Sequence, residues 1–352
     1  MTLADRIVAR IKVDGPITVA DYMAECLLHP TLGYYTMQNP IGASGDFITA
    51  PEISQMFGEI VGLCLAQAWL DQGAPKTFTL LELGPGRGTL MSDILRATRA
   101  VPGFHASAQI HLLEASPRMR TRQQETLPGA TLHFIDDIAQ VPKQPLWCVA
   151  NEFFDALPIR QFQRAPAGWR EKRVGHENGT LAFGHGPVLP QVVLDHRLED
   201  TEEGDVVEWA PAAFPICAAI GTRITTHGGA ALIIDYGDWR SKGDTLQAVR
   251  AHDYAPVLEN PGKNDLTAQV DFEALATAAA CAHTQLTPQG LFLERLGITQ
   301  RAQSLASKLE GDARAAHIFA HRRLTHPDEM GNLFKILGLY PRGTPPPAGL
   351  DI

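Results

Sequence analysis

The clearest pattern along the chain is a short apolar run that ends in closely spaced glycines. The leucines of residues 80–83 form a segment of the kind that becomes a buried strand. Glycines at positions 84, 86 and 88 follow, and apolar residues from Leu90 to Leu95 then recur at helical spacing. The pattern predicts a strand, a tight turn and a helix, in which the backbone of the turn is open to a flat ligand.

Further apolar runs of strand length follow this unit and alternate with helical segments. They are residues 109–114, 131–135, 146–150 and 230–236. Two later runs, 284–287 and 333–339, are expected to pair in antiparallel fashion and close the sheet. The alternation predicts an α/β fold with a Rossmann-like sheet of seven strands, most of them parallel.

Helical patterns also precede this sheet. Residues 1–13 place apolar side chains on one helical face, and Thr18, followed by an acid three residues later, marks a second helix that ends at Pro30. Thr49 is expected to cap a single long helix, with Glu52 in the capping-box position. We therefore expect a helical extension on the N-terminal side of the sheet.

The same patterns divide the chain into a core with additions. Residues 1–75 form an N-terminal helical region that covers the cofactor, and residues 76–160 and 225–340 form the Rossmann-like catalytic core. Residues 161–224, which contain an Asn-Gly hairpin signal, form an α+β insertion. This insertion is either a solvated decoration or a lobe that docks the substrate. Residues 341–352 are rich in proline and are expected to be a disordered tail.

Composition narrows the functional classes. The 352 residues carry a net charge of −9 and no basic run, which argues against nucleic acid as the main partner. The longest apolar stretch, 60–70, is about half a membrane span, so no membrane insertion is expected. Five widely spaced cysteines indicate reduced thiols in a bacterial cytoplasm. His317, His321 and His326 lack the glutamate of a zinc-binding helix, so no metal is expected.

The spacing of the glycine loop distinguishes two classes of cofactor. A dinucleotide-binding loop would have its third glycine at position 89, where this chain has Thr89. Glu82 precedes the glycines, and the resulting Glu-x-Gly-x-Gly-x-Gly resembles the first motif of class I S-adenosylmethionine (SAM) methyltransferases. A carboxylate attracts a cationic cofactor and repels a pyrophosphate. We therefore expect Glu82, Gly84, Gly86 and Gly88 to bind SAM.

Acids at the ends of the next two strands extend this site. Glu114 ends the second strand, where an acid commonly accepts both ribose hydroxyls, and Ser116 is expected to cap the helix that follows. Asp136 and Asp137 end the third strand. In class I enzymes this position approaches the adenine, so the resemblance implies that one of the two aspartates accepts the exocyclic amine.

Three blocks of sequence resemble the MidA-like family of SAM-dependent methyltransferases. They are residues 45–54, 82–89 and 151–158, and the segments 234–237 and 265–272 also fit. The family comprises bacterial relatives of a mitochondrial methyltransferase that assists the assembly of respiratory complex I. The resemblance implies a protein arginine methyltransferase whose partner is a complex I subunit.

An arginine acceptor makes specific demands on the site. Guanidinium is protonated at any cellular pH, so carboxylates must orient its N–H groups, draw charge from the attacking nitrogen and remove a proton. Glu152 and Asp155 would meet this demand if they shared one face of a turn, and Asp46 is a third candidate acid. Asn151 and Phe47 are expected to contact the cofactor.

Other functions are compatible with the same pattern. The chain could be a complex I assembly or binding factor that keeps the SAM fold without essential turnover, or a methyltransferase for a small molecule. A nicotinamide-dependent enzyme is a further hypothesis, against which Thr89 and Glu82 argue.

Overall fold

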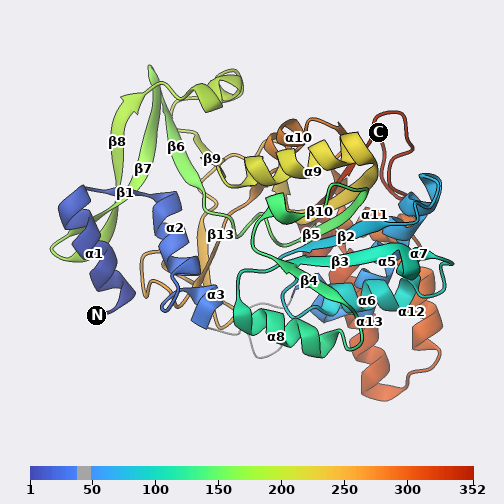
Figure 1. Ribbon diagram of the computed structural model, residues 1–352. Helices are drawn as coiled ribbons and strands as arrows, with labels where there is room; N and C mark the ends of the chain where they lie inside the picture. The colour runs from blue at the N-terminus through green and yellow to red at the C-terminus, as the bar shows by residue number, and fades with distance from the viewer. Residues whose placement is uncertain (38–48) are drawn as a thin grey trace. The chain divides into compact units, whose positions relative to one another are not determined.

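The computed structural model describes residues 1–37 and 49–352 (Figure 1). The chain forms two compact units, each assembled from separate stretches of sequence. The first unit comprises Met1–Phe47, Asp155–Ala213 and Arg240–Asp271, and the second comprises Ile48–Phe154, Phe214–Trp239 and Phe272–Ile352. The polypeptide therefore passes repeatedly between the two units.

A mixed β-sheet forms the centre of the second unit. Its strands that belong to the second unit are β2 (Phe78–Leu83), β3 (Ala108–Leu113), β4 (Leu132–Ile135), β5 (Leu146–Asn151), β10 (Gly229–Asp238), β15 (Ala282–His283), β16 (Thr287–Pro288) and β17 (Phe334–Tyr340). The order is β15-β17-β10-β5-β2-β3-β4, and β16 also pairs with β17. Strands β2, β3, β4, β5 and β10 are parallel, whereas β17 is antiparallel to β10. The predicted α/β sheet is confirmed, but the count of seven strands is not, because β17 pairs with two separate short strands.

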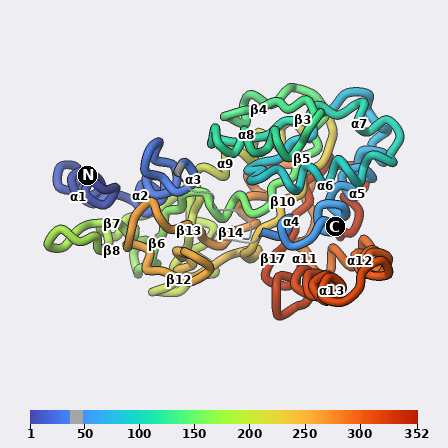
Figure 2. Tube along the Cα trace, turned by 90° about the horizontal axis from the view of Figure 1, so that it is seen from below, coloured from blue at the N-terminus to red at the C-terminus, as the bar shows by residue number. Residues whose placement is uncertain are grey.

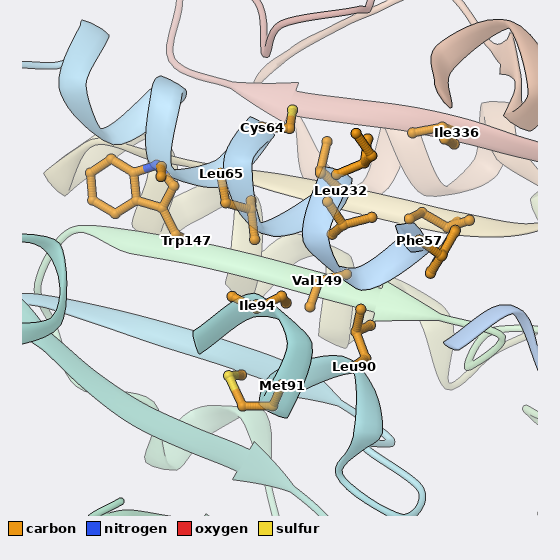
Figure 3. Packing of buried hydrophobic residues seen from close by; sticks show 14 of the residues in the cluster. Phe57, Cys64, Leu65, Leu90, Met91, Ile94, Trp147, Val149, Leu232 and Ile336 are labelled. Carbon is orange, nitrogen blue, oxygen red and sulfur yellow. The ribbon is translucent and has the colours of Figure 1, made fainter. Parts of the chain in front are cut away.

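Helices cover both faces of this sheet. They are α4 (Ala50–Ile53), α5 (Gln55–Asp71), α6 (Thr89–Thr98), α7 (Phe104–Ser107), α8 (Pro117–Thr126), α9 (Ala213–His227), α10 (Phe272–Ala279), α11 (Gln289–Arg295), α12 (Ile298–Ala306) and α13 (Gly311–Thr325). Figure 3 shows side chains of α5 and α6, among them Phe57 and Ile94, packed on one face of the sheet against Val149 of β5 and Leu232 of β10. Side chains alternate along a strand, and Cys148 of β5 therefore points to the other face, where Cys217 of α9 lies near its thiol.

The predicted long helix after Thr49 is wrong. Ser54 has an extended backbone, with φ of −161° and ψ of 137°, and it separates the four-residue α4 from α5. The Ser54 hydroxyl accepts the N–H of Met56 and so caps α5, whereas the Thr49 side chain makes no capping hydrogen bond. The Glu52 carboxylate is consequently available for other contacts.

The division into units also differs from the predicted domains. The sequence predicts α5 as part of an N-terminal covering region, but the helix packs in the core of the second unit because it buries residues nearly all round its circumference. The first unit takes residues 240–271 from the predicted core, and α9 belongs mainly to the second unit rather than to the insertion.

The predicted disorder of the C-terminal tail is also wrong. Leu350 is only 6% exposed, and Gln285 donates its backbone N–H to the Asp351 carbonyl. Arg295 of α11 donates to the Gly349 carbonyl at 3.1 Å and pairs with the Asp351 carboxylate at 2.7 Å, so that the end of the chain lies beside α11 (Figure 2). Apolar contacts and these hydrogen bonds offset the low folding tendency of a proline-rich segment.

The first unit is built on antiparallel strands. One sheet has the order β1-β7-β6-β9, with β8 paired to β7, and a smaller sheet has the order β12-β11-β13. These elements are β1 (Ile17–Thr18), β6 (Arg160–Ala165), β7 (Gly168–Glu177), β8 (Thr180–Leu189), β9 (Val206–Trp209), β11 (Gln247–Arg250), β12 (Asp253–Ala255) and β13 (Asp265–Thr267), with β14 (Val270–Asp271) and the helices α1 (Leu3–Asp14), α2 (Val19–Leu28), α3 (Tyr34–Met37) and η2 (Val192–Arg197).

Two local predictions in the first unit are confirmed. Asn178 and Gly179 have φ of 50° and 85°, and they form the turn between β7 and β8 as the Asn-Gly signal predicted. Thr18 caps α2 in a capping box with Asp21. Within residues 1–37 and 49–352, no helix has both the length and the apolar character needed to cross a bilayer.

Candidate active site

The glycine loop lies at the carboxyl end of β2 and requires its glycines. Gly84, Gly86 and Gly88 have φ of 60°, 51° and 81°, which other residues rarely adopt. A Cβ at Gly84 would lie 2.8 Å from a ring carbon of Phe153. The loop therefore presents bare backbone at the edge of the sheet where α/β folds bind ligands.

Glu82 is a buried carboxyl near the end of β2, two residues before the first glycine of this loop. Burial raises its pKa to about 8, with a smaller contribution from the charge of Glu114 and an opposing one from the Met91 N–H. Its Oε2 is buried and has no hydrogen-bond partner. A buried carboxylate oxygen without a partner is costly, and a cationic ligand beside it would remove that cost. The side chain therefore fits the charge of SAM.

Glu114 is held in place by the helix that follows it. Its Oε1 accepts the backbone N–H of Ser116 at 2.7 Å, and its Oε2 accepts Gln123 Nε2 at 3.0 Å. Each oxygen retains a lone pair that can accept a hydroxyl. Ser116 occupies the N-cap position of α8, as predicted, but its side chain makes no capping hydrogen bond; its backbone N–H donates to the Glu114 carboxylate at the start of the helix. Burial raises the pKa of Glu114.

The two aspartates after β4 have structural partners. The Asp136 carboxylate lies 2.5 Å from Arg120 Nη2 and is largely exposed. The Asp137 carboxylate accepts the N–H of Ala139 at 2.8 Å and caps the short helix η1 (Ile138–Gln140). Contact of either side chain with adenine remains a prediction.

Glu152 has a strained backbone at the end of β5. Its φ is 51°, and its N–H donates to the Ile234 carbonyl of β10 at 2.9 Å. Its Oε1 accepts the N–H of Ala50, at the start of α4, at 3.1 Å and Asn151 Nδ2 at 3.0 Å. Asn151 Oδ1 is buried without a hydrogen-bond partner. Left-handed non-glycine residues held by several contacts are common at functional sites.

The Asp155 backbone is hydrogen-bonded within the first unit. Its carbonyl accepts the N–H of Ala268 at 2.9 Å. Burial, then the charges of Asp265 and Asp155, raise the pKa of Tyr35 well above its usual range, and Tyr35 donates its hydroxyl to Asp265 Oδ1 at 2.9 Å. That Glu152 and Asp155 share one face of a turn remains a prediction.

Two acids near the site were not anticipated in these roles. Glu52 of α4 accepts Thr89 Oγ1 at 2.5 Å and Arg87 Nη1 at 3.2 Å, and so links α4 to the glycine loop. Asp235 of β10 is fully buried, and its Oδ2 accepts the N–H of Phe154 at 3.0 Å. An acid inside an otherwise apolar strand was the available sequence signal for Asp235.

Two site predictions, Asp46 and Phe47, lie outside the described residues. His317 Nε2 lies 3.0 Å from the Ala302 carbonyl, and His321 Nε2 lies 3.0 Å from Thr299 Oγ1. In the described part of the chain, no three His, Cys, Asp or Glu side chains are arranged to hold a metal ion.

Comparisons with known proteins show the family to which the chain belongs. A family model for S-adenosyl-L-methionine-dependent methyltransferases matches residues 60–291. The mitochondrial protein arginine methyltransferase NDUFAF7 of Xenopus tropicalis is 36% identical over 384 residues, which cover 99% of this chain and 89% of the relative. The Homo sapiens protein of the same name is 36% identical over 362 residues, with 94% and 82% covered.

A solved structure is similar over the same length. It is a protein of Burkholderia thailandensis bound to S-adenosyl-homocysteine, with 29% sequence identity and a TM-score of 0.83, and the match covers 99% of this chain and 93% of that one. SAM is the cofactor that these similarities support, and it fits both the glycine loop and the buried oxygen of Glu82 that has no hydrogen-bond partner. The chain belongs to the MidA-like family of SAM-dependent methyltransferases.

Proposed function

We propose that this methyltransferase modifies an arginine side chain of another protein, and that the protein is a subunit of respiratory complex I. The observation that carries the arginine assignment is Glu152, an acid on a strained backbone at the end of β5. The relatives named protein arginine methyltransferases support the same acceptor. The complex I subunit rests on the resemblance of the sequence blocks.

Glu152 has the chemistry that a guanidinium acceptor needs. SAM supplies a methyl group on a sulfonium whose sulfur leaves as a neutral thioether. The Glu152 carboxylate attracts the guanidinium, orients its N–H groups and draws positive charge away from the attacking nitrogen. The transfer leaves one proton to be removed, and Glu152 and Asp155 are the proposed carboxylates for this step. Hydrogen bonds from Ala50 and Asn151 hold the Glu152 side chain in one orientation.

The first experiment identifies the acceptor. The purified protein is incubated with methyl-labelled SAM and the cognate complex I subunit, and the labelled residue is identified by mass spectrometry. We expect methylarginine. Label on a small molecule alone would replace the proposal with small-molecule methylation.

A Glu152→Gln variant separates catalysis from binding. We expect kcat to fall about 100-fold while the affinity for SAH is retained, since the acid acts on the acceptor. Glu125→Gln, which changes an exposed glutamate of α8, is the matched control and should leave both quantities unchanged. If complex I assembly persists in cells carrying an inactive Glu152→Gln protein, the function is binding rather than methylation.

We also propose that the first unit docks the protein substrate through an acidic apolar surface. This surface is formed by residues 189–205, which contain six carboxylates and one arginine. Its exposed apolar residues are Leu189, Val192, Val193 and Leu198. Leu194 packs in the core of the unit, and the buried Arg197 pairs with Asp200 and Asp271, so the segment is held rigidly. Negative charge around exposed apolar side chains suits a basic, arginine-bearing segment.

The cytoplasmic location is part of the same proposal. Cys26, Cys64, Cys148, Cys217 and Cys281 are buried free thiols, as expected for a reducing compartment. Fractionation of the native host should recover the protein with the cytoplasmic fraction, and recovery with a membrane pellet that resists salt extraction would contradict it.

A further inference from the structure

Helix α8 has a glutamine where an apolar residue would be expected. Met119 and Gln123 are its buried residues, spaced one helical turn apart, and Leu127 continues the same line just after the helix. Gln123 is fully buried. A buried amide costs free energy unless its polar atoms are hydrogen-bonded, so its place on this face calls for a reason.

Both donors of the Gln123 amide are used at the cofactor site. Nε2 donates to the Gly86 carbonyl at 2.7 Å and to Glu114 Oε2 at 3.0 Å. The side chain also lies against the glycine loop, since a Cβ on Gly88 would be 3.4 Å from Gln123 Cγ. A single side chain thus connects the loop after β2 to the acid after β3.

The chemistry of the neighbours determines the orientation of the amide. The Gly86 carbonyl can only accept, and a flipped amide would direct its oxygen at that carbonyl. In the orientation observed, Gln123 Oε1 is buried and has no hydrogen-bond partner. The glutamine therefore leaves one polar atom of its own unsatisfied, whereas an apolar side chain of similar size would leave the Gly86 carbonyl and Glu114 Oε2 without this donor.

We propose that Gln123 is a positioning residue for recognition of the cofactor ribose. It holds Glu114 Oε2 while the Ser116 N–H holds Oε1, so that one lone pair on each oxygen is directed at the two ribose hydroxyls. The inference rests on the proposed role of Glu114 as the ribose acceptor. Gln123 itself acts through Glu114 and does not contact the ribose.

The test combines a variant with a modified ligand. Gln123→Met keeps the volume of the side chain and removes both donors. We expect its affinity for SAH to fall about tenfold, and its affinity for an SAH analogue that lacks both ribose hydroxyls to fall less than about twofold. Thermal stability without ligand should fall only slightly, because loss of the unsatisfied oxygen partly offsets loss of the two hydrogen bonds to the Gly86 carbonyl and Glu114 Oε2. Gln124→Met, on the exposed face of the same helix, should change none of these quantities.

The outcomes are distinguishable. An equal loss of affinity for both ligands would show a general disturbance of the loop and overturn the proposal, and so would unchanged SAH affinity. Glu114→Gln tests the underlying assignment: if it does not discriminate between SAH and the analogue, Glu114 does not bind the ribose. If Glu114→Gln discriminates and Gln123→Met does not, the role of Gln123 alone is wrong.

A second substitution covers the case in which Gln123→Met does not fold. Gln123→Glu has the same shape but places a carboxylate against the Gly86 carbonyl and the Glu114 carboxylate. We expect it to weaken SAH binding more than about tenfold at pH 8, with partial recovery at lower pH, where a protonated carboxyl can donate one hydrogen bond. Wild-type affinity in this variant would overturn the proposal.

Discussion

Two buried glutamates, one in each unit, differ in how fully their carboxyl oxygens are hydrogen-bonded. Glu82 precedes the glycine loop of the second unit, and Glu208 lies in β9 of the first unit; burial raises the pKa of both carboxyls. Glu208 accepts Gln161 Nε2 at 2.7 Å, the Thr245 N–H at 2.9 Å and the Thr245 hydroxyl. Glu82 keeps one buried oxygen without a partner.

This difference distinguishes a buried carboxyl that stabilises the fold, Glu208, from one that can bind a ligand, Glu82. The hydrogen bonds to Glu208 compensate for its loss of water and join β9 to the segment at Thr245. The buried Glu82 oxygen without a partner raises the free energy of the ligand-free protein. A cationic ligand removes that cost, so it binds more favourably than it would beside a carboxylate that is already hydrogen-bonded. Burial and a raised pKa alone would not have distinguished the two residues.

The largest expected effect is a loss of SAM affinity when a glycine of the loop after β2 is replaced. Gly84→Val would drive the side chain into Phe153 and force a valine to a φ of 60°, so SAM affinity should fall more than about 100-fold in calorimetric titration. Gly179→Ala is the control in the first unit, because φ there is 85° but no atom lies within 4 Å of the added Cβ. It should cost about 1 kcal/mol of stability and leave SAM affinity unchanged. Equal SAM affinity in both variants would remove the loop from the binding site.

The next effect is a pH dependence that belongs to Glu82 and not to Glu208. The pKa of Glu82 is raised from 4.5 to about 8, so the folded, ligand-free protein holds an extra proton between these values and loses stability as pH rises through them. A bound cation favours the ionised form, and SAM affinity should therefore rise up to about tenfold per pH unit as pH approaches 8.

Glu82→Gln should abolish this contribution, and Glu208→Gln should preserve it. Affinity measured from pH 6 to pH 9 for both variants and the wild type provides the check, and titration of the ligand's own amine cancels in the comparison. The same slope in Glu82→Gln and in the wild type would assign the proton to another group.

A smaller effect is expected at the acidic apolar surface of the first unit. Val192→Lys adds positive charge and removes an apolar contact where the basic substrate is proposed to dock, so KM for the protein substrate should rise about fivefold, with SAH affinity unchanged. Val13→Lys is the matched control, since Val13 is 84% exposed and Val192 is 81% exposed in the same unit. Equal KM values in the two variants would argue for a solvated decoration at residues 189–205.

The smallest effect concerns helix caps, one in each unit. Thr18→Ala should cost about 1 kcal/mol because Thr18 Oγ1 accepts the Asp21 N–H at 3.0 Å in a capping box. Thr49→Ala should cost less than about 0.5 kcal/mol, since Thr49 makes no capping bond. Thermal unfolding, with a shift of about 2–4 °C for the first variant, is the measurement. A larger cost for Thr49→Ala would indicate an additional role for Thr49.

Features that depend only on neighbouring residues could be predicted from the sequence. The strand and glycine turn at 80–88, the Asn178-Gly179 hairpin and the Thr18 cap follow from side-chain periodicity and from the φ that glycine and asparagine permit. The parallel orientation of the strands followed from their alternation with helices. The family resemblance indicated the cofactor.

Contacts between residues far apart in the chain became evident only from the packing of the elements. Gln123 reaches Gly86 and Thr89 reaches Glu52 across 37 residues, and Phe154 reaches Asp235 across 81. The ordered C-terminal tail and the assembly of each unit from separate stretches of sequence also depend on such distant contacts. Periodicity records which side of an element is buried, but not which remote donor or acceptor lies opposite, because that depends on how the elements pack.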